Sequence, residues 1–318
     1  MRIAGIEDSV SAPKFAPAMP LADTPSSIAM IGITLGDAAG IGPEIIDAAL
    51  QSGKLNPAFK YRVIGNRAGV QPGAPTRATA EAAREALEEA ITLAQHGEIA
   101  AVVTGPIHKA RMKAIGFEFP GQTEFFATRT QTENFAMCLT GGALTVALVT
   151  AHVPLREVPD LLCAAEIVRV GQLLGEFLTR RGCVKPRVAV AGLNPHAGES
   201  GELGTEEIDI IEPAIRTLQS KAGNGAVFTG SFSPDTVFNR AVAGEFDGVL
   251  CMYHDQGLIP LKLHAFDQGV NVTLGLPYPR TSPDHGTAFE IAGKGLARAD
   301  SMIAAINLAA SLAQPIAV

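Results

Sequence analysis

The sequence predicts an α/β protein whose sheet is mostly parallel. Short apolar runs rich in β-branched residues alternate with stretches rich in Ala, Leu and Glu, which is the pattern of βαβ units. The 318 residues are 47% hydrophobic and 18% charged, enough to bury a large core in two domains or one large one. Polar turns containing Gly or Pro follow directly after several apolar runs, as expected where strands end at a ligand cleft.

Eight apolar runs are expected to form the strands. They cover residues 28–34, 60–65, 100–105, 145–151, 187–193, 226–231, 248–253 and 270–276. Helices are expected between many of them, as over 76–97 and 162–181. The first of these helices has apolar residues at helical spacing and ends at Gly97, which suits a helix C-terminus. Another helix is expected to begin with Ser233 as its cap and Pro234 in its first turn.

The composition argues against several classes of partner. A net charge of −7 and a pI near 5.5 disfavour a nucleic-acid or anionic-membrane surface. No apolar run approaches the roughly 18 residues that span a bilayer. Residues 1–27 contain acids and prolines without a secretory apolar segment, so we expect a flexible extension. Four cysteines without a CxxC pair predict reduced thiols in a cytoplasmic protein.

Polar motifs follow five of the expected strands. In chain order the motifs are "GDAAGIGPE", "TGPIHK", "AHVPL", "NPHAGE" and "YHDQG". Because the carboxyl ends of parallel strands meet at one edge of the sheet, the five motifs predict one cleft, or two clefts that share a rim. The first motif, "GDAAGIGPE", does not fit the GxGxxG dinucleotide pattern and is interpreted as a tight strand-to-helix turn.

The last three of these motifs each place a histidine one to four residues after the apolar run, at His152, His196 and His254. A single histidine in such a turn is more often a structural hydrogen-bonding residue. Three at equivalent strand ends could instead hold a divalent metal with a position left open for substrate. Zn²⁺ suits three imidazoles, while Co²⁺, Ni²⁺ and Mn²⁺ remain open.

Acidic and basic residues near these motifs have two interpretations each. Asp255 could accept a proton near the metal, or could orient the neighbouring imidazole. Asp235 could act in the cleft, although complementing a helix dipole is the more ordinary role. Lys262 and Arg280 flank a strand and could form a small anion pocket. His285 lies in a glycine-bearing loop, where it could face a flat heterocycle.

Taken together, these segments resemble the 4-hydroxythreonine-4-phosphate dehydrogenase family of vitamin B6 biosynthesis. The resemblance covers about residues 30 to 315. It runs through "GDAAGIGPEI", "VVTGPIHK", "GFEFPGQTEFFA", "VALVTAHVPLREVP", "GLNPHAGESGELGTEEIDIIEPAI", "SPDTVF", "MYHDQGLIPLK" and "VNVTLGLPYPRTSPDHGTAFEIAG".

The resemblance implies an isopropylmalate-dehydrogenase-like, three-layer α/β/α fold of two domains with a cleft between them. The first domain would combine 28–135 with 271–318 and hold the NAD-binding loop. The second, 136–270, would hold the metal site and the dimer contacts. The implied assembly is a homodimer with active sites at the subunit interface.

The resemblance also assigns residues. The metal ligands would be His152, His196 and His254, for one divalent ion per site (Zn, Co or Mg). The candidate catalytic residues are Asp235, Asp255 and Lys262. The substrate-binding positions are Gln122, Thr123, Lys262, Asn271 and Arg280. The NAD-binding positions are Asp284, His285, Gly286, Thr287 and Gly293.

The implied reaction is NAD-dependent, metal-assisted oxidation of 4-(phosphooxy)-threonine at C3. The 2-amino-3-oxo acid formed would decarboxylate to 3-amino-2-oxopropyl phosphate. The family usually has "GHTE" where this chain has Gln122, which cannot carry charge. The alternatives are a dehydrogenase of threonate or erythronate 4-phosphate, or of a cis-dihydrodiol dicarboxylate, and an inactive metal- or nucleotide-binding scaffold.

Overall fold

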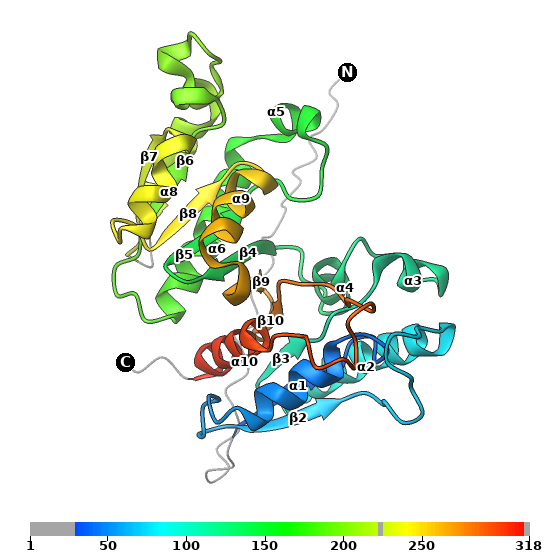
Figure 1. Cartoon of the computed structure of the whole chain (residues 1–318). Coiled ribbons are helices and arrows are strands. Elements are labelled where there is room, and N and C mark those ends of the chain that lie inside the picture. Colours follow the sequence, from blue (N-terminus) through cyan, green and yellow to red (C-terminus); the bar gives the residue numbers. More distant parts are fainter. Residues whose placement is uncertain (1–28, 222–224, 315–318) are drawn as a thin grey trace, which may run out of the picture.

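One continuous sheet organises the protein, for which we use a computed structural model describing residues 29–221 and 225–314 (Figure 1). The expected extension over 1–27 lies outside the described residues. Ten strands form this sheet within the described part of the chain. They are β1 (Met30–Thr34), β2 (Lys60–Ile64), β3 (Ala101–Thr104), β4 (Ala136–Gly141), β5 (Leu144–Leu148), β6 (Arg187–Ala191), β7 (Val227–Phe232), β8 (Gly248–Cys251), β9 (Val270–Leu274) and β10 (Arg280–Pro283).

The strand order is β2-β1-β3-β10-β9-β4-β5-β8-β6-β7. Strand β4 pairs antiparallel with β5 and β9, and β9 pairs antiparallel with β10; the other pairings are parallel. The expectation of a mostly parallel sheet is therefore confirmed. The proposed two-domain division falls between β9 and β4, which are hydrogen-bonded neighbours in the centre of the sheet. It stays a prediction.

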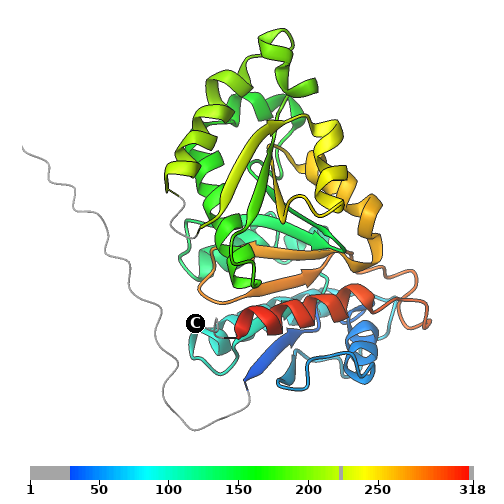
Figure 2. The ribbon, with the colours of Figure 1, turned by 90° about the vertical axis from the view of Figure 1, so that its left-hand side faces the viewer.

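Helices cover both faces of the sheet, which confirms the three-layer α/β/α architecture (Figure 2). Helices α1, α6, α7 and α10 share one apolar core, while α2, α3 and α4 form a second, and α8 and α9 a third. The helices are α1 (Gly42–Gln51), α2 (Arg77–Gln95), α3 (Lys109–Ala114), α4 (Gln122–Arg129), α5 (Val158–Leu161), α6 (Ala164–Arg180), α7 (Glu212–Lys221), α8 (Pro234–Val242), α9 (His254–Ala265) and α10 (Asp300–Ala313).

The two expected long helices match α2 and α6 within a few residues at each end. Helix α2 begins at a reciprocal capping box between Thr76 and Thr79, and Gly97 follows it with φ of +72°. Helix α8 starts with Pro234 after Ser233, as expected. The capping prediction was wrong in detail, because the Ser233 hydroxyl donates to Asp235 Oδ1 at 2.6 Å instead of capping the backbone.

Two strands were not expected from the sequence. Strand β4 has the mixed sequence "AMCLTG", and β10 has the sequence "RTSP", which has little intrinsic strand preference. Both lie inside the sheet, where neighbouring strands satisfy their backbone groups. Tertiary pairing therefore decided these elements.

The structure also describes the cysteines and the length of the apolar helices. The four cysteines are unpaired, and burial raises the pKa of the Cys138 thiol to about 12, so that thiol stays protonated. In the described part of the chain, no helix combines the length and apolar character needed to cross a bilayer.

Candidate active site

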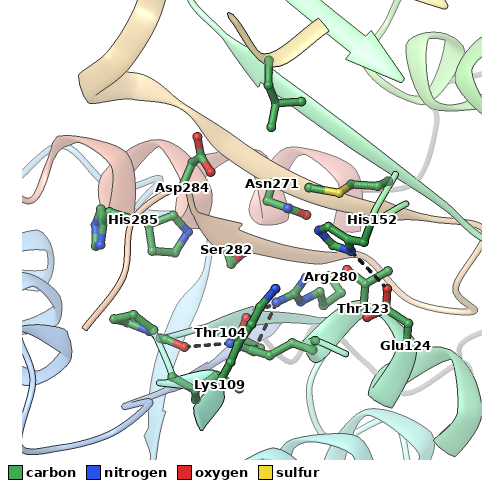
Figure 3. A pocket seen from close by; sticks show the side chains of 18 of the residues that line it. Thr104, Lys109, Thr123, Glu124, His152, Asn271, Arg280, Ser282, Asp284 and His285 are labelled. Carbon is green, nitrogen blue, oxygen red and sulfur yellow. Dashed lines mark hydrogen bonds and ion pairs between the residues drawn. The ribbon is translucent and has the colours of Figure 1, made fainter. Parts of the chain in front are cut away.

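A cavity of about 310 Å³ lies where the two halves of the sheet meet (Figure 3). Three of the five polar motifs line it, namely those after β3, β5 and β8. The motif after β1 and the "NPHAGE" motif do not. Nine of the predicted site residues line the cavity: Gln122, Thr123, His152, His254, Lys262, Asn271, Arg280, Asp284 and His285.

Arg280 is the most buried charge at this cavity, with only 2% of its surface exposed. It occupies the start of β10, between β3 and β9, and packs its guanidinium 5.6 Å from the centre of the Phe126 ring. Its Nη1 donates to Thr273 Oγ1 at 3.2 Å, and its Nη2 donates to Thr104 Oγ1 at 2.5 Å. These partners hold the side chain in place but are neutral.

No carboxylate among the described residues lies within ion-pair distance of Arg280, and its Nε has no hydrogen-bond partner there. Desolvation lowers the pKa of Arg280 to about 10. A buried cation without a counter-charge is costly unless an anion pairs with it. This part of the cavity is therefore built to receive an anionic group.

Polar side chains line the cavity beside Arg280, and one of their atoms is unsatisfied. Asn271 Oδ1 is buried without a partner among the described residues. The Thr123 and Thr273 hydroxyls share a long hydrogen bond of 3.4 Å. The free Asn271 Oδ1 favours a polar ligand, because an apolar one would leave it unpaired.

Lys262 reaches the cavity from α9 and makes an ion pair with Asp284, with 2.9 Å between Nζ and Oδ2. Asp284 follows β10, and its backbone N–H donates to the Ser301 hydroxyl. A predicted substrate-binding residue therefore meets a predicted cofactor-binding residue across the cavity.

Two of the three predicted metal ligands lie together. The His152 and His254 rings have centroids 5.8 Å apart. His152 Nδ1 lies 3.7 Å from Glu124 Oε1, and the neighbouring imidazole lowers the pKa of Glu124. His254 Nδ1 lies 2.6 Å from Asp255 Oδ1. Carboxylates at Nδ1 leave each Nε2 for a ligand, which is the usual arrangement of metal-binding histidines.

His196 is not part of this pair. Its side chain is 59% exposed and lies 3.9 Å from Asp235 Oδ2, and neither residue lines the cavity. Within 29–221 and 225–314, no group of three or more His, Cys, Asp or Glu residues could hold a metal ion. One chain therefore brings together two of the three predicted ligands.

The segment that carries His196 has an unusual backbone. Residues 196–200 all have positive φ, although only Gly198 among them is a glycine. Such a left-handed run costs roughly 1–2 kcal/mol for each non-glycine residue. Glu207, only 2% exposed, anchors this segment: its Oε1 accepts from the Leu193 and Asn194 N–H groups, and its Oε2 accepts from Asn194 Nδ2.

Replacing Glu207 with alanine should lower the free energy of unfolding by about 2–4 kcal/mol, because two partly buried backbone N–H groups and the Asn194 amide lose their acceptor. Urea unfolding would measure this loss. Glu202→Ala, an exposed change in the same loop, should shift stability by less than about 0.5 kcal/mol. Equal losses in the two variants would contradict the anchoring role.

The loop predicted to bind NAD is fixed against α1. The Thr287 carbonyl accepts from the Ile41 N–H, and the Gly293 N–H donates to Glu44 Oε2. His285 lines the cavity, where desolvation lowers its pKa, and His285 Nδ1 lies 3.3 Å from the Gly286 carbonyl. Gly286, Thr287 and Gly293 do not line the cavity themselves.

Several cavity residues were not anticipated. Thr104 and Ser282 line it from β3 and β10, and Glu124 contacts His152 from α4. Glu124 lies in the same "GQTEFF" segment as two predicted residues, so closeness in sequence to Gln122 and Thr123 was the available signal. Glu207 gave no local signal, because its partners precede it by 13 and 14 residues.

Comparisons with known proteins agree on one family. Residues 39–309 match the family described as "Pyridoxal phosphate biosynthetic protein PdxA". The chain is 44% identical to 4-hydroxythreonine-4-phosphate dehydrogenase of Desulfosudis oleivorans, over 88% of this chain and 95% of that protein. It is 42% identical to D-threonate 4-phosphate dehydrogenase of Salmonella typhimurium, over 89% of this chain and 98% of that protein. A crystal structure of 4-hydroxythreonine-4-phosphate dehydrogenase from Klebsiella pneumoniae superposes with a TM-score of 0.76 at 38% identity, over 90% and 100%.

Proposed function

The chain belongs to the PdxA family of pyridoxal phosphate biosynthetic proteins, and we propose that it oxidises 4-(phosphooxy)-threonine at C3 with NAD⁺. The 2-amino-3-oxo acid that results would lose CO₂ to give 3-amino-2-oxopropyl phosphate. The observation that carries this proposal is the buried, unpaired Arg280 at the wall of the cavity. It supplies the cation that a phosphorylated substrate requires.

The substrate phosphate would bind at the Arg280 guanidinium, and the neighbouring Thr104 hydroxyl would be a neutral hydrogen-bonding partner. Lys262 and Asn271 line the same cavity and would bind the polar amino-acid end. Thr123 lines the cavity and bonds to Thr273, which accepts from Arg280. Holding both ends fixes the position of C3 and lowers the entropic part of the barrier.

A divalent ion would be held by His152 and His254, whose Nδ1 atoms lie against carboxylates. When bound, such an ion lowers the pKa of the substrate alcohol. The third ligand would be His196 of a second copy, since this chain's own His196 is outside the cavity. That arrangement requires a homodimer with shared active sites.

One exposed surface supports this dimer. Ile259, Leu263 and Phe266 are 65%, 89% and 74% exposed and follow one another at helical spacing along α9 and the turn after it. Exposed apolar stripes of this kind mark protein contacts. Helix α9 also carries His254 and Lys262, so a partner bound there would adjoin the active site.

The remaining side chains would handle protons and cofactor. Asp255 orients His254, which supports a positioning role, and Asp235 would act only beside the partner's cavity, together with His196. The ammonium of Lys262 would donate the proton required at carbon when CO₂ leaves. Asp284, His285, Gly286, Thr287 and Gly293 would form the NAD-binding loop. We place this enzyme in the cytoplasm.

NADH formation with 4-(phosphooxy)-threonine tests the proposal. We expect turnover that a chelator abolishes and that a divalent ion restores. D-threonate 4-phosphate is the second candidate, because the Salmonella relative carries that name and Arg280 suits either phosphate. Turnover only with D-threonate 4-phosphate would replace the substrate, and none with any phosphorylated hydroxy acid would overturn the assignment.

A further inference from the structure

The Gln122 side chain is held at both ends of its amide. It is the first residue of α4, at the edge of the cavity. Its Oε1 accepts from Arg280 Nη2 at 3.1 Å, and its Nε2 donates to the Gly105 carbonyl at 3.2 Å. Both contacts are tertiary, because they join α4 to β10 and to the segment after β3.

These contacts permit only one orientation of the amide. If the group were reversed, Nε2 would face the Arg280 N–H and Oε1 would face the Gly105 carbonyl. The first contact would then bring two donors together, and the second would bring two acceptors together. Gln122 therefore presents an acceptor to Arg280 and is fixed in that role by the backbone.

Gln122 also supplies no charge. The nearby Glu124 carboxylate points to His152. The Thr104 and Thr273 hydroxyls that accept from Arg280 are neutral, as is the Gln122 amide. Arg280 is thereby oriented by three neutral acceptors and makes no direct ion pair among the described residues, although the Glu124 carboxylate acts on it from a greater distance.

We infer that Gln122 is a positioning residue that aims the Arg280 guanidinium at the anionic end of the substrate while leaving its charge available. This inference rests on the proposed function only in taking that anion to be a phosphate. A carboxylate at the same position would pair with Arg280 and compete with the ligand. An apolar side chain would leave the guanidinium less well oriented.

Gln122→Glu provides the decisive test, because it keeps the shape and adds the competing charge. Inorganic phosphate binding by calorimetry should weaken about 100-fold, and KM for the phosphorylated substrate should rise in parallel with kcat changed less than about threefold. The same variant should unfold at nearly the same urea concentration as the wild type without phosphate, because the new partner for the buried cation is offset by the loss of the Nε2 donor to the Gly105 carbonyl. Damage to the fold would instead lower both binding and stability.

Two further variants complete the experiment. Gln122→Met removes the acceptor without adding charge, and should weaken phosphate binding about fivefold. Gln95→Glu makes the same chemical change on the exposed surface of α2, and should leave binding unchanged within about twofold.

The outcomes separate the two proposals. If the wild-type protein does not bind phosphate at all, both the phosphate site and the role of Gln122 are overturned. If the wild type binds phosphate and Gln122→Glu binds it within about threefold, only the positioning role of Gln122 is overturned.

Discussion

Replacing Arg280 with methionine is expected to abolish turnover of phosphorylated substrates and, at the same time, to stabilise the fold. Methionine fills a similar volume against Phe126 but carries no charge. Loss of a buried, hydrogen-bonded cation from a binding site costs roughly 2–5 kcal/mol, so kcat/KM should fall by about 30- to 5,000-fold. The measurement is initial-rate kinetics over a wide substrate range.

The stability effect has the opposite sign for a physical reason. Desolvation lowers the pKa of Arg280 to about 10, which means that the fold disfavours the charged form. An apolar replacement removes that penalty but leaves the Thr104, Thr273 and Gln122 oxygens without their donor. We expect the first effect to exceed the second, so that the free energy of unfolding rises by about 1 kcal/mol in phosphate-free buffer. Urea unfolding would measure it.

Arg280→Lys is the matched control, because it keeps the charge and loses the forked geometry. It should retain the wild-type stability more closely and recover part of the affinity. A methionine variant that is both inactive and less stable would indicate that Arg280 is mainly structural. That result would remove the main support for the phosphate site.

Mixing two inactive variants is expected to restore activity if the third metal ligand comes from the partner. His196→Ala and His254→Ala should each lose at least about 10³-fold in kcat, as when a metal ligand is removed. In a mixed dimer, one site receives both substitutions and the other receives neither. Random re-association of equal amounts should therefore return about a quarter of the wild-type rate.

The control for this experiment mixes His152→Ala with His254→Ala. These two residues lie together in one chain, so every site in the mixed dimer lacks one of them. No recovery is expected. No recovery in the first mixture, with subunit exchange confirmed, would place all three ligands in one chain. Recovery in the control would instead mean that His152 and His254 of one chain serve different sites, which would overturn the pairing seen here.

Local patterns in the sequence accounted for most of the fold. Helices α2 and α6 could be predicted without tertiary information, because hydrophobic periodicity marks the one face that a helix buries. Eight strands could be predicted from apolar runs in the same way, namely β1, β2, β3, β5, β6, β7, β8 and β9. Strand β10 could not be found in this way. Its "RTSP" sequence becomes a strand only because β3 and β9 lie on either side of it and pair with it.

For the candidate site as well, one part could be predicted from the sequence and another part depends on the tertiary structure. The sequence by itself determined which chemical groups are present: imidazoles, carboxylates, an arginine and a lysine placed after strands. Only the tertiary structure decided which of them meet, joining His152 to His254, Lys262 to Asp284, and Arg280 to Gln122 and Thr104, while placing His196 beside Asp235. The reason is that periodicity constrains neighbours within a few residues. Contacts between residues more than 100 positions apart, such as that between Arg280 and Gln122, depend on strand order, and no local pattern encodes strand order.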